Sequence, residues 1–554
     1  FEADTDGHGN NVAVGANAAE NMSTGTENVA VGQSAMGSGV TTGNNNIAIG
    51  ANAGNSLTSG EANALIGKFA GDALTTGSNN IAIGYEALTA EDGNGRNIAI
   101  GYIALSTLNA GTDAYNIAIG HNAGANVSTG VQNTIIGGLA GDSLTTGSYN
   151  TAVGYQALST EDAHGRNTAI GWKALNAQDA GADAHNTVVG FEAGKTISTA
   201  QRNTIMGSAA GDALTTGSDN VAIGYGALSA EDTGGKNVAI GRGALGTLDA
   251  GSDGYNIALG YYSGLAMTTG NSNITMGYNS AYQLTTGASN IVIGTNAMTA
   301  ANGSESRNIA IGHGALQNMD NDANNYNVAI GHNAGNDITT GTENTLIGGL
   351  AGDELTEGGG NIAIGSSALS SETTGGQSIA IGKAAMQSAT LADFNIAIGS
   401  NALQNLTQGS LTHTHNVAIG KSAGQAMTTG TLNVIVGNQA GDALTDGQSN
   451  TVVGYEALSA EQGGDENTAI GIQALRVSVG GSNNTAIGRR AGVAVSSGDN
   501  NTIIGHDAGG IQGGSNNIII GKDATASAVS DSNTTVIGTT TTTSALVHGL
   551  KQPV

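Results

Sequence analysis

The amino-acid sequence predicts an all-β protein, a parallel β-solenoid of about 31 turns, and three observations lead to this prediction. An eight-residue motif, Asn-x-Ala-Ile-Gly-x-x-Ala, recurs along almost the whole chain. Counted by its glycine, the motif occurs 31 times from Gly15 to Gly538, mostly with the same spacing as that between Gly67 and Gly84. Aromatic residues make up only 3% of the 554 residues, so the bulky side chains that usually fill a globular core are scarce.

The length of the repeat selects the architecture. Helical repeats and propeller blades have periods of roughly 33 to 50 residues, which is far longer than the period of this motif. The shorter period fits one solenoid turn, which we expect to contain two short strands and two bends. Stacked one strand spacing of about 4.8 Å apart, the turns would form a rod about 145 Å long.

The strand within the motif is apolar on both faces. The residue before the glycine, such as Ile83 before Gly84, is aliphatic in every copy. Two residues earlier the residue is mostly Ile, Val or Thr, and the residue between them is usually Ala, as at Ala82. Because side chains alternate across a strand, both faces need cover. One face can point into the solenoid, and the other predicts contact with a second chain.

The asparagine four residues before the glycine predicts a ladder of side-chain amides along the stack. Only Ser378 and Thr534 replace it. Stacked amides can hydrogen-bond from turn to turn and satisfy backbone groups at the bend. The glycine indicates a backbone with positive φ or a close approach between turns. The residues that represent these structural positions are Asn80, Ile83, Gly84, Ala87, Asn150, Gly154, Asn220 and Gly224.

The second half of each turn has two forms, which alternate in pairs. They give a repeating unit of four turns, so that Gly50 and Gly120 open successive four-turn units. One form ends in Thr-Thr-Gly, as at Thr75-Thr76-Gly77, and the other in an acidic bend such as Glu91-Asp92. Paired carboxylates could bind Ca²⁺, but the bends lack the glycine-rich run of calcium-binding β-rolls, so we expect solvated charges there. Threonine pairs are a feature of ice-binding solenoids, but here they lie beside a glycine bend in only some turns.

The composition limits the partners of the chain. Acidic residues number 43 and basic residues 16, so the net charge of −27 disfavours nucleic acid and anionic membranes. There is no cysteine, which excludes disulfides and thiolate metal sites. No apolar run reaches the length of a transmembrane helix. The chain begins at Phe1, which indicates a processed product or a fragment.

The sequence contains no recognisable catalytic motif. It lacks His-Glu-x-x-His and the Gly-Lys-Ser/Thr phosphate loop, and its glycine spacing belongs to the repeat. Left-handed hexapeptide acyltransferases use similar aliphatic-Gly-x-x-Ala signals, but with three units per coil rather than one. We therefore predict that the chain is not an enzyme and uses no cofactor. A pocket that breaks the repeat would favour a ligand-binding solenoid instead, and the clearest break lies near His413.

The Asn-x-Ala-Ile-Gly-x-x-Ala repeats resemble the head of trimeric autotransporter adhesins, the YadA-like left-handed parallel β-roll, and are similar to repeats of bacteriophage tail-fibre proteins. The resemblance covers Asn11 to about Gly538, with turns a few residues longer than the common adhesin turn. It implies a homotrimer with three rolls around one axis. It also implies an extracellular place, on a virion tail fibre or a bacterial surface, and attachment to a glycan or protein receptor of a host cell.

The predicted organisation is a lead-in at 1–10, a continuous repeat shaft at 11–538 and a threonine-rich tail at 539–554 that leads to a tip or folding segment. The neck, coiled-coil stalk and membrane barrel of an autotransporter do not occur in this sequence. We therefore expect a phage tail-fibre shaft, with a bacterial adhesin head or extracellular filament as the alternative.

Two histidines form the sharpest local anomaly. His413 and His415 lie in the longest insertion, which separates Gly399 from Gly420. In an extended segment both side chains point to one side. Facing a threefold axis, three chains would supply six imidazoles to a transition metal, an arrangement found in phage fibre tips that resemble this segment. Insertions in solenoids usually bulge outward, so we expect a surface bend without metal.

Overall fold

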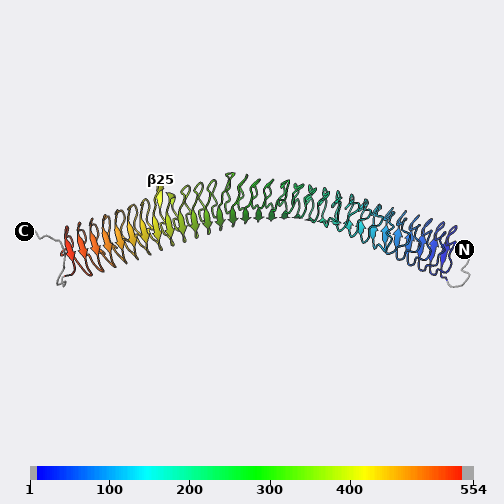
Figure 1. Ribbon diagram of the computed structural model, residues 1–554, viewed down its shortest axis with the longest axis horizontal. Helices are drawn as coiled ribbons and strands as arrows, with labels where there is room; N and C mark the ends of the chain where they lie inside the picture. Colours follow the sequence, from blue (N-terminus) through cyan, green and yellow to red (C-terminus); the bar gives the residue numbers. More distant parts are fainter. Residues whose placement is uncertain (1–8, 540–554) are drawn as a thin grey trace, which may run out of the picture. The chain divides into compact units, whose positions relative to one another are not determined.

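The computed structural model describes residues 9–539, and this part of the chain holds 33 β-strands and no helix. The chain divides into two units, Phe1–Asn279 and Ser280–Val554, and each is a parallel β-solenoid with one short strand per turn (Figure 1). The prediction of about 31 parallel turns, each with one copy of the motif, is confirmed. The predicted lead-in up to residue 8 and the tail from residue 540 lie outside the described residues.

The strands of the first unit are β1 Val12–Val14, β2 Val29–Val31, β3 Ile47–Ile49, β4 Ala64–Ile66, β5 Ile81–Ile83, β6 Ile98–Ile100, β7 Ile117–Ile119, β8 Thr134–Ile136, β9 Thr151–Val153, β10 Thr168–Ile170, β11 Thr187–Val189, β12 Thr204–Met206, β13 Val221–Ile223, β14 Val238–Ile240, β15 Ile257–Leu259 and β16 Ile274–Met276.

The strands of the second unit are β17 Ile291–Ile293, β18 Ile309–Ile311, β19 Val328–Ile330, β20 Thr345–Ile347, β21 Ile362–Ile364, β22 Ile379–Ile381, β23 Thr390–Asp393, β24 Ile396–Ile398, β25 Thr407–His413, β26 Val417–Ile419, β27 Val434–Val436, β28 Thr451–Val453, β29 Thr468–Ile470, β30 Thr485–Ile487, β31 Thr502–Ile504, β32 Ile518–Ile520 and β33 Thr535–Ile537.

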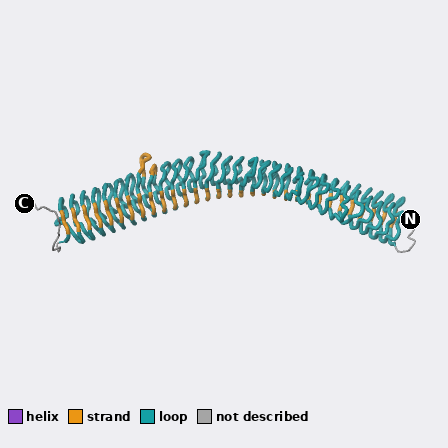
Figure 2. The backbone as a smooth tube through the Cα atoms, viewed as in Figure 1, coloured by secondary structure: helices purple, strands orange, loops and turns teal. Residues whose placement is uncertain are grey.

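The strands of successive turns pair in parallel and in register. In β5 and β6, for example, Ala82 lies opposite Ala99 and Ile83 opposite Ile100. The strands therefore line one side of each unit, and turns and bends form the other (Figure 2). Among the strands of residues 9–539, only β23 and β25 pair apart from this stack, in a small parallel sheet made by the insertion that Figure 1 labels at β25.

The interior of each turn is thin, and two segments fill it with side chains. One is the strand, and the other is the segment after the corner glycine, which we call the limb after the corner. The middle residue of the strand, such as Ala82 in β5 or Ile135 in β8, is fully buried. The limb after the corner adds Ala87 and Leu88, which are also fully buried. The interior therefore consists mainly of alanine and aliphatic side chains, which explains why so few aromatic residues are needed.

The prediction of two strands per turn is wrong, because the limb after the corner is not extended. A strand cannot bury two consecutive residues on one face, yet Ala87 and Leu88 both point inward. Glu86 and Leu88 have φ angles of 51° and 54°, and these left-handed residues curl the chain so that the alternation is lost. The limb still bonds to its neighbours, since the amide of Leu88 donates to the carbonyl of Ala104 on the next turn.

The glycine at the corner after each strand is required by both conformation and space. Gly84 has a φ of 143°, which side chains rarely adopt. A Cβ at this position would lie 2.2 Å from the carbonyl oxygen of Gly101 on the next turn. The same close approach recurs at Gly154 and Gly224, so the turns can stack at this corner only where the side chain is missing.

The asparagine of the motif joins three successive turns. Asn220 is fully buried, and its Oδ1 accepts a hydrogen bond of 2.9 Å from the backbone amide of Asn237 on the following turn. Its Nδ2 donates at 3.0 Å to the carbonyl of Gly234. Its own amide donates at 2.9 Å to Oδ1 of Asn203 on the preceding turn. Asn80 and Asn150 are buried in the same way. The backbone amide of each donates to the asparagine Oδ1 of the preceding turn, and the Oδ1 of each accepts from the asparagine amide of the following turn.

Replacing Asn220 by alanine is expected to destabilise this part of the solenoid by about 2–6 kcal/mol. The change leaves the buried amide of Asn237 and the carbonyl of Gly234 without partners, and each such loss costs about 1–3 kcal/mol. Hydrogen exchange of the amides around residues 220–237 measures the local effect. Thr233→Ala, in an exposed bend of the same turn, is the matched control and should change exchange little. Equal protection in both variants would contradict the role of the ladder.

Candidate functional site

An exposed column of aromatic side chains follows the corner glycines of the first unit. These residues stand directly after the motif glycine, and we call them the aromatic column: Tyr85, Tyr102, His121, Tyr155, Trp172, Phe191, Tyr225, Tyr261 and Tyr278. Rings on adjacent turns stack, with centroids 5.3 Å apart for Tyr85 and Tyr102 and 4.8 Å apart for Trp172 and Phe191. Exposed, stacked rings present an apolar surface with polar tips, which suits contact with amphipathic ligands.

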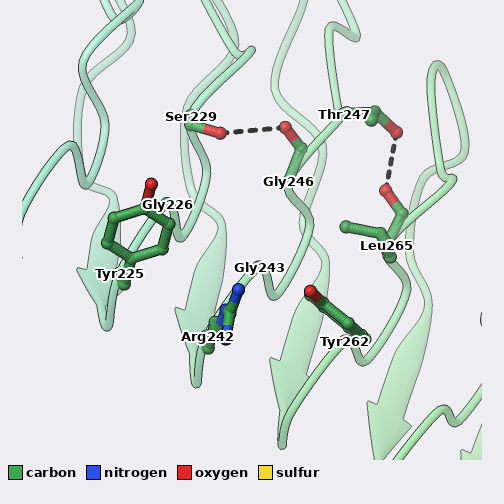
Figure 3. Close-up of a pocket in the computed structure, with 9 residues that line it drawn as sticks. All are labelled: Tyr225, Gly226, Ser229, Arg242, Gly243, Gly246, Thr247, Tyr262 and Leu265. Carbon is green, nitrogen blue, oxygen red and sulfur yellow. Dashed lines mark hydrogen bonds between the residues drawn. The ribbon is translucent and has the colours of Figure 1, made fainter.

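A pocket interrupts the regular surface where the aromatic column reaches β13 to β15. It has a volume of about 200 Å³ and opens between three successive turns (Figure 3). The residues that line it are Tyr225, Gly226, Ser229, Arg242, Gly243, Gly246, Thr247, Tyr262 and Leu265. The repeat pattern of the sequence does not predict this pocket, because the clearest break in the repeat lies near His413.

Three glycines create the hollow. Gly226, Gly243 and Gly246 stand where the two preceding four-turn units carry side chains. The equivalent residues, one and two units earlier, are Gln156 and Glu86, Lys173 and Ile103, and Asn176 and Ser106. The replacement of these side chains by glycine, which is visible when the four-turn units are aligned with one another, could therefore have located the pocket from the sequence.

Arg242 projects between the rings on either side of the pocket (Figure 3). Its guanidinium carbon lies 5.6 Å from the ring centroids of Tyr225 and Tyr261 and 5.8 Å from that of Tyr262. These distances fall within the range of cation–π attraction. Arg242 forms no ion pair with any residue that the structure describes. By contrast, Arg166 and Arg202 each pair with an aspartate on the following turn.

Hydroxyl groups fix the far wall of the pocket. Oγ of Ser229 donates to the carbonyl of Gly246 at 3.1 Å, and Oγ1 of Thr247 donates to the carbonyl of Leu265 at 2.6 Å (Figure 3). Each hydroxyl keeps acceptor lone pairs after donating its proton. A hydrogen bond with Tyr262 raises the pKa of Tyr261. The wall therefore offers hydroxyl oxygens that can accept hydrogen bonds.

The glutamates of the acidic bends are not solvated, which corrects the expectation from the sequence. Glu91, Glu161 and Glu231 are fully buried, whereas the aspartate after each of them is exposed. Oε1 of Glu231 accepts from the amide of Gly234 at 2.6 Å, and Oε2 accepts from the amide of Ala250 on the next turn at 3.3 Å. Burial raises the pKa of Glu231. Glu231 therefore ties two successive bends together.

One of these bends gathers ligands that could hold a divalent cation. Donor atoms of Glu161, Asp162, His164 and Asp179 all lie within 4.8 Å of one another. An imidazole nitrogen with three carboxylates suits a borderline metal such as Zn²⁺ or Mn²⁺. Nδ1 of His164 lies 3.4 Å from Oε1 of Glu161, so an ion pair between these two groups also accounts for their proximity.

The candidate metal ligands of the insertion lie on its surface. The side chain of His413 is 64% exposed, and its Nδ1 is 3.2 Å from a carboxylate oxygen of Asp393. His415 stacks on Phe394 with ring centroids 5.2 Å apart, and the centroids of the two histidines are 6.0 Å apart. His415 has a φ of 50°, so the segment is not extended through both histidines. Both histidine rings therefore have partners within the chain: His413 contacts the carboxylate of Asp393, and His415 stacks on Phe394.

Comparison of the sequence with protein-family models and with curated proteins found no match.

The pH dependence of stability is expected to reflect Asp353. One buried oxygen of this carboxylate has no hydrogen-bond partner among the described residues, and desolvation by burial raises its pKa from 3.8 to about 6. The folded state therefore holds a proton more tightly than the unfolded state, so stability falls as the pH rises from about 4 to about 6. Asp353→Asn should remove this fall and be more stable than the parent above pH 6.

Denaturant unfolding between pH 4 and pH 8 measures this effect. Glu357→Gln changes the same charge at an exposed position nearby and is the control. A parent protein whose stability rises through this pH window to the same extent as that of Asp353→Asn would contradict the prediction.

Proposed function

We propose that the chain is the shaft of a homotrimeric extracellular fibre, most simply a phage tail-fibre shaft that presents or forms a surface for binding a host receptor. The observation that carries the proposal is an apolar face left open on the strands of both units. The same face suits the head of a bacterial surface adhesin, which remains the second candidate because its repeats have the same form.

The open face consists of the first and last residues of each strand. Ile47 and Ile49 of β3 are 40% and 38% exposed, while Ala48 between them is fully buried. The same pattern recurs at Met206 of β12 in the first unit and at Val434 of β27 in the second. Each turn adds an aliphatic or Met side chain at its last strand position and Ile, Val, Thr or, in β4, Ala at its first. Soluble monomers rarely expose contiguous apolar patches of this extent.

Further copies of the same chain are the occupant that fits this face best. The face carries Ile, Val and Thr and no charged residue at the strand positions, so a second copy meets it without desolvating a charge. The acidic residues lie outside the stacked strands, and the bend aspartates Asp92, Asp162 and Asp232 are exposed. Parallel copies can therefore pack strand face to strand face without placing these carboxylates in the interface. The number three follows from the resemblance to trimeric adhesins and fibres.

The proposed role in attachment follows from what such an assembly offers. A stack of nearly identical turns provides a long scaffold and exposes bends and the aromatic column on its sides. Among the described residues no helix is long and apolar enough to cross a membrane.

Ile223→Asp is expected to convert the trimer into monomers. Ile223 is half-buried in the single chain, so a carboxylate there stays solvated in the monomer, whereas three chains packed together would bury it. Burying an unpaired carboxylate costs several kcal/mol per chain. Sedimentation equilibrium measures the mass. Val221→Thr, a change that the repeat itself makes at Thr151, is the control and should leave a trimer. A parent protein that sediments as a folded monomer would refute the assembly.

Fluorescently labelled trimer is expected to bind to the cells that carry its receptor and to show no turnover of acyl, glycosyl or phosphoryl substrates. Flow cytometry on a panel of bacterial strains measures attachment, and the Ile223→Asp monomer tests whether attachment needs the assembly. Attachment should fall at least about tenfold for the monomer, since three linked copies bind with avidity. Hydrolysis of a surface polysaccharide by the purified trimer would overturn the non-enzymatic proposal.

A further inference from the structure

We propose that the pocket between Tyr225, Arg242 and Tyr262 binds a single carboxylate-bearing sugar unit of a cell-surface polysaccharide. The inference rests on the proposed attachment function and names the class of ligand that one site would recognise.

The glycines of the pocket provide space rather than backbone freedom. Gly226 and Gly243 have φ angles of 61° and 63°. The equivalent residues of the preceding units have nearly the same angles and carry side chains, with φ values of 53° at Gln156 and 54° at Lys173. The backbone of these turns therefore accepts a side chain. The glycines therefore leave open a space that side chains occupy in the two preceding units.

The cation in the pocket indicates an anionic group on the ligand. The chain has 16 basic against 43 acidic residues, and Arg166 and Arg202 pair with aspartates on adjacent turns. Arg242 is held by aromatic rings instead, and no described carboxylate pairs with it. A planar guanidinium matches a carboxylate through two parallel hydrogen bonds. The net charge of −27 opposes a polyanion, but a single carboxylate in direct contact is attracted at short range.

The rings and the size of the pocket indicate a sugar as the carrier of that carboxylate. The rings of Tyr225 and Tyr262 flank the hollow, and the C–H face of a pyranose packs on such surfaces. The acceptor lone pairs of Ser229 and Thr247 and the phenol groups can meet sugar hydroxyls. A volume of about 200 Å³ is below the range of about 300–1,000 Å³ for larger ligands, so one ring fits. Phosphate is less suited, because the lining offers only one cation.

The test uses methyl β-glucuronoside and the matched neutral sugar methyl β-glucoside as probes of the full-chain trimer. Saturation-transfer NMR should show binding of the glucuronoside at least about tenfold tighter than that of the glucoside. Arg242→Gln should remove this preference. Arg166→Gln removes the same charge from an arginine outside the pocket and is the control that should leave it unchanged.

Two further variants fill the pocket with side chains that the repeat already accepts. Gly226→Gln and Gly243→Ile restore the residues found at Gln156 and Ile103, so they are expected to keep the fold and to lose glucuronoside binding. A Cβ at position 243 would lie 2.7 Å from the ring of Tyr262, so the second variant displaces that ring from the pocket.

Each outcome decides the inference. Equal binding of both sugars, binding by neither, or full binding by the filled variants would overturn it. The attachment proposal is judged separately, by sedimentation and cell binding of the parent protein. A trimer that attaches to cells but ignores glucuronoside would refute only the ligand assigned to this pocket. A monomer that binds glucuronoside through Arg242 would refute only the fibre.

Discussion

The hydrogen bonds of the motif asparagine are the interaction on which the rest of the structure depends. The side chain of Asn220 accepts from the amide of the following turn and donates to a carbonyl of the bend, so one residue satisfies two buried backbone groups. Without it, every turn would bury polar groups that nothing else in the thin interior could meet. Because the bond always joins equivalent positions, it also fixes the register, and the register places each Ala, Ile and Gly above its counterpart.

That constraint explains where binding can arise. The strand positions must carry uncharged side chains such as Ile, Val, Ala or Thr, the motif asparagines must stay buried, and the corner glycines must lack a side chain. The freely variable positions therefore lie on the limb after the corner and on the bends. The pocket uses only such positions. Gly226 and Gly243 remove side chains from the limb, and Arg242 replaces a ring in the aromatic column, while β13, β14 and β15 keep their geometry. A rigid, repetitive scaffold can thus gain a specific site through a few substitutions.

Much of the fold could be predicted from the sequence because the repeat reports it directly. The regular period, the aliphatic residue before each glycine and the asparagine ladder all have their counterpart in the structure. The shape of the limb after the corner could not be predicted, because Leu88 adopts a left-handed conformation that leucine rarely adopts. The burial of Glu91 was hidden for a similar reason, because a carboxylate in a polar bend normally remains solvated. The pocket depends on glycines at positions where the motif specifies no residue type, so the motif does not predict it.

The in-register stacking has a consequence for how such a chain can evolve. Asn220 bonds within its own turn and to the turns directly before and after it, and the corner at Gly224 approaches the corners of these two neighbouring turns. If recombination removed or duplicated a whole four-turn unit, the two new neighbours would face each other with the same chemistry as the old ones. The number of turns is therefore free to drift genetically, whereas a small deletion within a strand would misalign it with both neighbours.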